Sequence, residues 1–301
     1  MFLGFYVNYT RRLQMSIHPR SYTAPVQIAY LKMQGAGNQI VVIDQRRKNA
    51  SPPSTSDIKR LANPGSGPGF DQLMWVGPAK DVNAAASYRV FNADGSEVEQ
   101  CGNGVRCVAW MLERSGNGDR SFTLESPAGL IDATVLDDGQ VAVSMGPPEF
   151  DPARIPFVAE QQSDRYELEV LGRSHDVSVL SMGNPHCVLR VDGIAAADVD
   201  RLGPAIEGHE RFPAGTNVGF MCVLDRTSIE LRVYERGVGE TLACGTGACA
   251  AVVAGQRLGQ LDDEVSVRLP GGQLVVSWRG GTEPVWLTGN AELVSEGTVD
   301  L

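Results

Sequence analysis

The chain alternates short apolar runs with polar or glycine-rich links, a pattern typical of a strand-rich protein. Val26–Met33 and Ile40–Asp44 are strand-like runs joined by a link with two glycines, and Gln72–Val76 is a further run of this kind. Val105–Arg114 and Ala248–Leu258 instead have helical length and apolar spacing, so we predict a helix at each. Further strands are predicted at Tyr88–Phe91, Val141–Met145, Tyr166–Leu171, Asp176–Met182, Cys187–Val191, Val218–Leu224 and Ile229–Tyr234, and further helices at Asp57–Leu61 and near Ala195–Leu202.

The second half of this pattern repeats the first. The tetrapeptide Cys101-Gly102-Asn103-Gly104 recurs 143 residues later as Cys244-Gly245-Thr246-Gly247, in each case ahead of a predicted helix. Two similar lobes would deliver equivalent groups to a site between them from opposite sides. Other matching positions are Arg89 with Arg232, Glu97 with Glu240, Gly37-Asn38 with Gly183-Asn184, and Gln72 with Asn217.

A proline-rich link separates the two copies. Residues 146–152 contain three prolines, which remove backbone donors and disfavour regular structure. We therefore predict an N-terminal lobe over residues 26–145, a C-terminal lobe over 146–289, and a final segment, 290–301, that crosses back to the first lobe. Residues 1–25 are interpreted as a flexible arm or a mis-called start, with Met15 as the alternative start.

Composition and charge narrow the function classes. With 43% hydrophobic residues in 301, the chain can bury a full core. Its net charge of −10 argues against nucleic acid or an anionic membrane as a partner, and no apolar run reaches the roughly 20 residues that span a bilayer. The six cysteines include no Cys-x-x-Cys pair, so we expect reduced thiols, no metal site and a cytoplasmic location.

The repeated cysteine motif suggests acid–base chemistry. A thiol at a helix N-terminus experiences the positive end of the helix dipole, which predicts a lowered pKa. The glycines expose backbone N–H groups that can bind a carboxylate. Two such thiols, Cys101 and Cys244, indicate one base and one acid on opposite faces of a carbon, as in a two-base amino-acid racemase. The chain has no Rossmann fingerprint or P-loop, so no nucleotide cofactor is indicated. No short motif excludes pyridoxal phosphate, but a two-thiol site would not need it, and we expect no cofactor.

Several of these residues also have ordinary structural interpretations. A lone cysteine is more often a small core residue, which is our interpretation of Cys107, Cys187, Cys222 and Cys249. Single asparagines are more often turn residues, and His186 alone would more often be structural. The repeated context reverses this balance for the two glycine-flanked thiols and favours a site.

Two long motifs resemble the signatures of the diaminopimelate epimerase family. Residues 92–107, Asn-Ala-Asp-Gly-Ser-Glu-Val-Glu-Gln-Cys-Gly-Asn-Gly-Val-Arg-Cys, are similar to the first signature, and residues 235–250, Glu-Arg-Gly-Val-Gly-Glu-Thr-Leu-Ala-Cys-Gly-Thr-Gly-Ala-Cys-Ala, to the second. Shorter family blocks occur in order at Gly69–Gln72, Gly183–His186 and Gly215–Asn217. The resemblance extends from Val26 to the C-terminus; Gln34 and Gln39 depart from the His and Asp that the family usually has there.

This resemblance implies a fold, an activity and a set of site residues. The implied fold is α/β (α+β), with two similar lobes, each a curved and mostly antiparallel sheet around a central helix. The implied activity is cofactor-independent interconversion of L,L- and meso-2,6-diaminopimelate, on the route to lysine and peptidoglycan, by a homodimer. The implied roles are acid and base for Cys101 and Cys244; α-carboxylate binding for Gly102, Asn103, Gly245 and Thr246; binding of the remaining substrate groups for Asn38, Gln72, Asn92, Asn184, Asn217, Glu235 and Arg236; and thiol tuning for His186 and Glu235.

Three other functions remain open from the sequence. A proline or hydroxyproline racemase of the same fold would also use two thiols, although the carboxamides and Arg236 suit a second charged amino-acid end better. A cysteine hydrolase would need only one activated thiol with a base. A non-enzymatic binding protein would bind an amino acid without exchanging its α-hydrogen.

Overall fold

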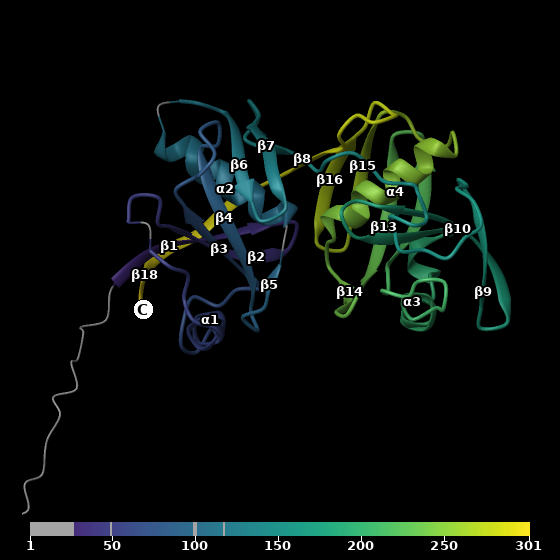
Figure 1. The fold of residues 1–301 in the computed structure, drawn as a ribbon, viewed down its shortest axis with the longest axis horizontal. Helices are drawn as coiled ribbons and strands as arrows, with labels where there is room; N and C mark the ends of the chain where they lie inside the picture. The colour runs from purple at the N-terminus through teal and green to yellow at the C-terminus, as the bar shows by residue number, and fades with distance from the viewer. Residues whose placement is uncertain (1–26, 49, 99–100, 117) are drawn as a thin grey trace, which may run out of the picture.

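The computed structural model describes residues 27–48, 50–98, 101–116 and 118–301. The prediction for residues 1–25 lies outside these ranges. Figure 1 shows two lobes side by side, with helix α2 (Gly102–Ser115) inside one and helix α4 (Gly245–Arg257) inside the other. The predicted fold class, two similar α+β lobes, is confirmed.

The first lobe is built from the first eight strands of the chain. β1 pairs antiparallel with β2, β2 parallel with β3, and β3 antiparallel with β4. β4 then pairs antiparallel with β5 and parallel with β6, and β6, β7 and β8 continue as antiparallel neighbours. The strands are β1 Gln27–Gly35, β2 Asn38–Asp44, β3 Gln72–Gly77, β4 Ala86–Asn92, β5 Glu97–Val98, β6 Ser121–Ser126, β7 Gly129–Val135 and β8 Val141–Ser144.

The second lobe repeats this pairing, strand for strand, from β10 to β17. Its two parallel pairs, β11–β12 and β13–β15, correspond to β2–β3 and β4–β6 of the first lobe. Matching bidentate ion pairs, Arg89–Glu97 and Arg232–Glu240, occur in the two copies. The strands are β9 Tyr166–Val170, β10 Arg173–Ser181, β11 Pro185–Arg190, β12 Asn217–Asp225, β13 Ser228–Glu235, β14 Gly239–Thr241, β15 Glu264–Leu269, β16 Gly272–Ser277 and β17 Trp286–Gly289.

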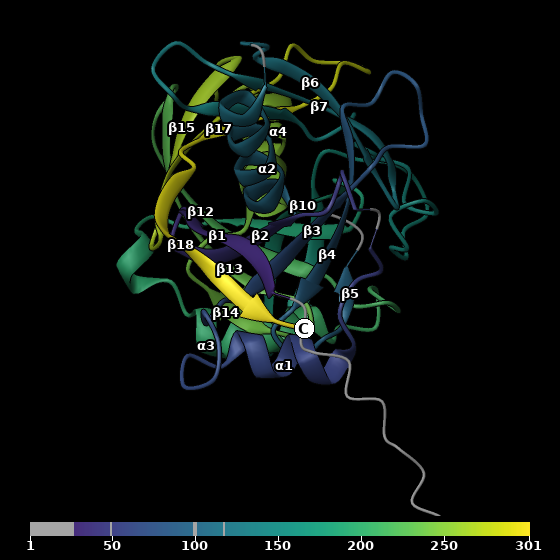
Figure 2. The ribbon, with the colours of Figure 1, turned by 90° about the vertical axis from the view of Figure 1, so that its left-hand side faces the viewer.

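The chain crosses between the lobes twice. After β8 it passes to β9, which pairs with β10, and after β17 it returns to β18 (Glu292–Asp300), which pairs with β1. β18 is the yellow strand that lies against β1 in Figure 2. β8 and β17 also pair with each other, so they join the lobes through backbone hydrogen bonds. The division of the chain at residues 145 and 289 stays a prediction.

Alternating side chains place helices on both faces of each sheet. In β2, Ile40 and Val42 belong to the core around α2, whereas Val41 and Ile43 pack with α1 (Thr55–Ala62) on the other face. In the second lobe α3 (Val199–Glu207) occupies the place that α1 has in the first. None of the helices in the described ranges is long and apolar enough to cross a membrane.

One helix differs from its prediction. A helix was predicted near Ala195–Leu202, but a short 3-10 turn occupies Ile194–Ala196 and α3 runs from Val199 through Glu207. The helix includes Gly203 and Pro204, and Gly203 lies against the ring of Tyr234, where a Cβ would come within 2.6 Å of Cγ. A glycine at this position allows the helix to pack closely on Tyr234.

Candidate active site

Three carboxamides gather at one edge of the first sheet. Asn38 begins β2, Gln72 begins β3 and Asn92 ends β4. Because β2 and β3 are parallel and β4 is antiparallel to β3, these three ends meet. Asn38 Nδ2 donates to Gln72 Oε1 at 3.2 Å, and Gln72 Nε2 donates to Asn92 Oδ1 at 3.2 Å.

Cys101 joins this network from the start of α2. It is the N-cap of the helix, and its Sγ accepts a hydrogen bond from the backbone N–H of Gly104 at 3.3 Å. Its thiol donates to Gln72 Oε1 at 2.7 Å. Gly102 and Asn103 follow it and are buried, so their backbone N–H groups lie in the unpaired first turn of the helix.

The second lobe brings the equivalent strand ends together with different side chains. Asn217 begins β12 beside His186 of β11, and its Nδ2 donates to the carbonyl of Pro185 at 2.9 Å. Its Oδ1 accepts from the backbone N–H of Arg236 at 3.0 Å. His186 Nε2 lies 3.0 Å from Oδ1 of Asn184. The Arg236 guanidinium donates to the carbonyl of Ala214 at 3.1 Å and is exposed, so it is available to a charged ligand.

Cys244 precedes α4 as Cys101 precedes α2. Its Sγ lies 3.6 Å from Thr246 Oγ1 and is hydrogen-bonded to the carboxylate of Glu235, which ends β13. Glu235 in turn accepts a hydrogen bond from Thr241. A Cβ at Gly247 would come within 3.2 Å of the sulfur, so this position leaves room for the thiol.

The two helix N-termini converge on one side chain. Leu287 of β17 is fully buried and lies against both Gly102 and Gly245. A Cβ added at Gly102 would be 3.2 Å from Leu287 Cδ2, and one added at Gly245 would be 2.9 Å from the same atom. Helices α2 and α4 are also in direct contact, and Figure 2, viewed along the long axis of the molecule, shows α2 in front of α4. The negative charge of Glu235 acts on both Cys101 and Cys244. The structure therefore brings the two motifs to one place.

The prediction of a lowered thiol pKa is wrong. Burial raises the pKa of Cys101, although hydrogen bonds from the N-terminal amides and the charge of Arg106 oppose it. Burial raises the pKa of Cys244 well above its ordinary value, and the carboxylate of Glu235 adds to the effect. Loss of hydration outweighs the helix terminus at both sulfurs because both lie between the lobes.

Burial also determines the protonation state of His186. Burial lowers the pKa of the imidazole to about 3, and the positive charge of Arg236 contributes in the same direction. His186 is therefore neutral at physiological pH. In the described ranges, no group of three or more His, Cys, Asp and Glu side chains is arranged to hold a metal ion.

The other four cysteines are buried, as predicted for core residues: Cys107, Cys187, Cys222 and Cys249. Three contacts around the site were not predicted. Thr241 orients Glu235, Leu287 underlies both motifs, and Arg106 Nη2 donates to Asn103 Oδ1 at 2.8 Å. Only the last had a sequence signal, because positions three apart on a helix are neighbours.

Solved structures show which proteins share this fold. A hydroxyproline epimerase from Agrobacterium vitis with bound trans-4-hydroxy-L-proline superposes with a TM-score of 0.66, 18% identity and coverage of 91% of this chain and 93% of that one. A methylitaconate-delta-isomerase gives a TM-score of 0.60 with 17% identity, over 92% of this chain and 96% of that one. At these identities the likeness shows a shared fold.

Sequence relatives then define the family. The family model described as diaminopimelate epimerase matches residues 30–150 and 178–294. Curated diaminopimelate epimerases from Alkalilimnicola ehrlichii and Thioalkalivibrio sulfidiphilus are 50% and 51% identical over 279 residues, which cover 92% of this chain and all of each relative. The chain belongs to the diaminopimelate epimerase family and is an isomerase.

Proposed function

We propose that this chain interconverts L,L- and meso-2,6-diaminopimelate without a cofactor, using Cys101 and Cys244 as a two-base pair. The observation that carries the proposal is the convergence of two cysteine-capped helix N-termini on Leu287. A single activated thiol would not require a second copy of the motif at the same place.

The reaction needs one thiolate and one thiol. The thiolate takes the α-proton, so an S–H bond forms as the Cα–H bond breaks and its electron pair moves into the α-carboxylate. The opposite thiol gives its proton to the other face of the same carbon and becomes the thiolate. Protons and charge balance, and the two sulfurs have exchanged roles.

The helix N-termini hold the reacting carboxylate in this proposal. The first-turn N–H groups near Gly102, Asn103, Gly245 and Thr246 are preorganised donors for the charge that develops on it. Glu235 and His186 tune the thiols, the first through its charge and the second as a neutral imidazole. The remaining polar groups bind the distal amino-acid end: Asn38, Gln72, Asn92, Asn184, Asn217, Glu235 and Arg236.

A deuterium-exchange assay tests the activity. L,L-Diaminopimelate incubated with the protein in deuterium oxide, without added pyridoxal phosphate, should gain deuterium at one α-carbon and yield the meso isomer. We expect Cys101→Ala and Cys244→Ala each to lower turnover by about 10²–10⁴-fold. If one of the two variants turned over normally, the two-base mechanism would be wrong.

The same assay with other substrates separates the alternatives. Racemisation of proline or hydroxyproline in place of diaminopimelate would identify the alternative racemase. Tight binding of diaminopimelate without α-hydrogen exchange would identify a binding protein.

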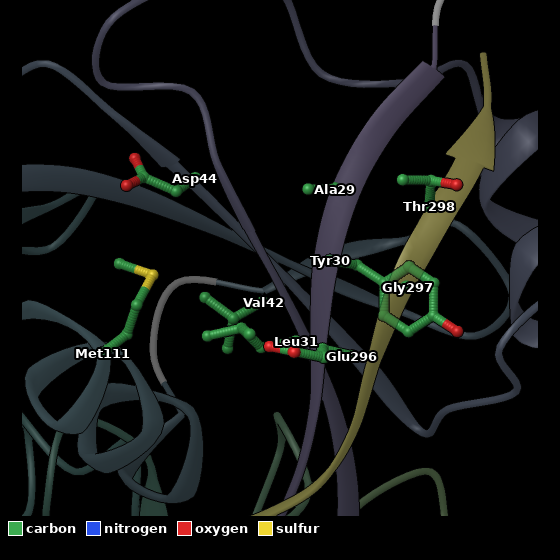
Figure 3. Close-up of a pocket in the computed structure, with 9 residues that line it drawn as sticks. All are labelled: Ala29, Tyr30, Leu31, Val42, Asp44, Met111, Glu296, Gly297 and Thr298. Atoms are coloured by element: carbon green, nitrogen blue, oxygen red, sulfur yellow. The ribbon is translucent and has the colours of Figure 1, made fainter. Parts of the chain in front are cut away.

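We also propose that the chain forms a homodimer through the outer edge of β18. In the described part of the chain β18 pairs only with β1, and Leu293 and Val294 on it are exposed. A cavity of about 550 Å³ opens over this strand pair, with Tyr30 lying across Gly297 (Figure 3). A second copy would cover this edge, which otherwise offers unpaired backbone groups. Sedimentation equilibrium should give twice the chain mass, and Val294→Lys should weaken the association.

We further propose a cytoplasmic enzyme of lysine and peptidoglycan-precursor synthesis, with the small-molecule substrate as its partner and neither nucleic acid nor membrane. All six cysteines are free, as reducing conditions require. Fractionation of cells that produce the protein should recover the exchange activity in the cytoplasmic fraction.

A further inference from the structure

A fully buried cation lies beside the site. Arg106 of α2 is 0% exposed, and no ion pair in the described ranges includes it. Its Nη2 donates to Asn103 Oδ1 at 2.8 Å and its Nε to the carbonyl of Asn290 at 3.2 Å, while Nη1 has no hydrogen-bond partner. A buried charge without a counter-ion is strongly unfavourable, so an anion at this place is the natural compensation.

Two strands leave space for the guanidinium. A Cβ at Gly35 of β1 would come within 3.2 Å of Nη2, and a Cβ at Gly289 of β17 within 3.3 Å of Cζ. Both positions are glycine, so the backbone closes around the charged group from two sides. Arg106 is thus held in one place and cannot turn away from Asn103.

Three thiols lie close enough to the guanidinium to interact with it electrostatically. They are Cys101 and Cys107 from α2 and Cys249 from α4. Burial raises the pKa of both Cys107 and Cys249 to about 12, so these two stay protonated. Cys101 is partly exposed and belongs to the site. Of the three, its sulfur is therefore the one that can carry a compensating negative charge.

The duplicated helix lacks this cation. At the offset of 143 residues Arg106 corresponds to Cys249, and the neutral Asn92 corresponds to Glu235. The first thiol therefore has a cation behind it, whereas the second is hydrogen-bonded to a carboxylate. Tyr88 and Glu235 also interact electrostatically with Cys101; the Tyr88 phenol is neutral because burial raises its pKa.

We propose that Arg106 is a positioning residue that makes Cys101, rather than Cys244, the sulfur that loses its proton first, and that fixes the Asn103 carboxamide for the α-carboxylate. This proposal rests on the proposed function. It assigns Cys244 as the resting thiol, held protonated by Glu235. The two lobes share a fold, but the charged group near the thiol is the cation Arg106 in the first lobe and the carboxylate Glu235 in the second.

Site-resolved alkylation tests the charge. Free enzyme is treated with iodoacetamide across a pH series, and modification of Cys101 and Cys244 is followed by peptide mass spectrometry. In the unaltered protein Cys101 should react at lower pH than Cys244. In Arg106→Met, alkylation of Cys101 should slow about tenfold near neutral pH, as for a thiol whose pKa rises by about one unit, and that of Cys244 should change less than about twofold.

Two further variants separate charge from positioning. Arg106→Lys keeps the positive charge but loses the planar set of guanidinium donors that bonds Asn103. It should therefore restore the alkylation rate of Cys101 toward that of the unaltered protein, while the KM for diaminopimelate stays raised by about tenfold. Arg114→Met removes an exposed arginine from the far end of the same helix and should leave both readouts unchanged. Should Arg106→Met fail to fold, Gly35→Ala serves in its place, because the added methyl group displaces the guanidinium. Alkylation of Cys101 should then also be slower.

Three outcomes would overturn the proposal: an unchanged alkylation profile at Cys101 in folded Arg106→Met, equal shifts at both thiols, or faster reaction of Cys244 in the unaltered enzyme. Alkylation needs no substrate. If diaminopimelate were not epimerised, the proposed function would fail while the thiol readout still decided the effect of Arg106 on Cys101.

Discussion

The thiol of Cys101 donates a hydrogen bond to Oε1 of Gln72 at 2.7 Å, so the first sulfur is tied to the same amide that links Asn38 and Asn92. One glutamine thereby connects the acid–base group to three strands of the first lobe. Such a network orients a sulfur more tightly than a helix terminus alone.

Replacement of this glutamine should disturb both the fold and the reaction. Gln72→Ala leaves the two asparagines and the thiol without their shared partner, and we expect a loss of about 1–3 kcal/mol in the free energy of unfolding. We expect turnover to fall by about one order of magnitude or more, because Cys101 loses its orientation. Urea denaturation and deuterium exchange measure the two effects. The exposed Gln162→Ala is the matched control, and equal behaviour of the two variants would contradict the role of Gln72.

The charge of Glu235 should control the reactivity of Cys244. Its carboxylate raises the pKa of that thiol, so Glu235→Gln should lower the pKa and increase the thiolate fraction at a given pH. Alkylation of Cys244 should then be faster at neutral pH, with its titration midpoint moved to lower pH. Glu230→Gln removes a carboxylate from the other end of the same strand and should leave the midpoint in place. A midpoint that moved upward in Glu235→Gln would refute this assignment.

His186 should make the fold sensitive to acid. Its pKa is about 3 in the folded protein and 6.5 as the ordinary value, so the unfolded chain binds the extra proton first. The stabilisation from a neutral His186 is complete above pH 6.5 and is lost progressively as the pH falls toward 3. We expect His186→Gln to reduce the acid slope of the unfolding free energy by up to about 1.4 kcal/mol per pH unit. Denaturant titrations in that window measure the slope, and an unchanged slope would show that His186 is protonated in the fold.

Leu287 should couple the stability of the core to the geometry of the site. Leu287→Ala removes the methyl group on which Gly102 and Gly245 both rest, and we expect a loss of about 2–5 kcal/mol in unfolding free energy. Leu124→Ala deletes an equally buried side chain of β6 and should have a similar effect on stability. Only Leu287→Ala should also raise the KM. The KM is measured for both variants under the same conditions. Equal values would show that Leu287 has no specific effect on the site.

Much of the fold could be predicted from the local sequence pattern. The runs Ile40–Asp44 and Gln72–Val76 predict strands, and the repeat predicts two lobes. The limits of α3 could not be predicted, because the helix packs on residues distant in sequence: Gly203 lies against the ring of Tyr234, 31 positions further along the chain. Local sequence carries no information on such a contact.

The site divides in the same way. The repeat located both thiols and the residues around them, but the direction of their pKa shifts depends on burial between lobes, which only the assembled fold creates. The surroundings of Arg106 likewise come from Gly35 and Gly289, two glycines on separate strands.

The double crossing of the chain has a consequence for how the protein can be divided. β9 follows the first lobe in sequence but completes the sheet of the second, and β18 does the reverse. A cut between β8 and β9 would give two fragments, of which the first lacks β18, its own edge strand, and the second carries that strand without a partner. Neither fragment would be a self-sufficient folding unit. Together, the fragments should reassemble, each supplying what the other's sheet requires.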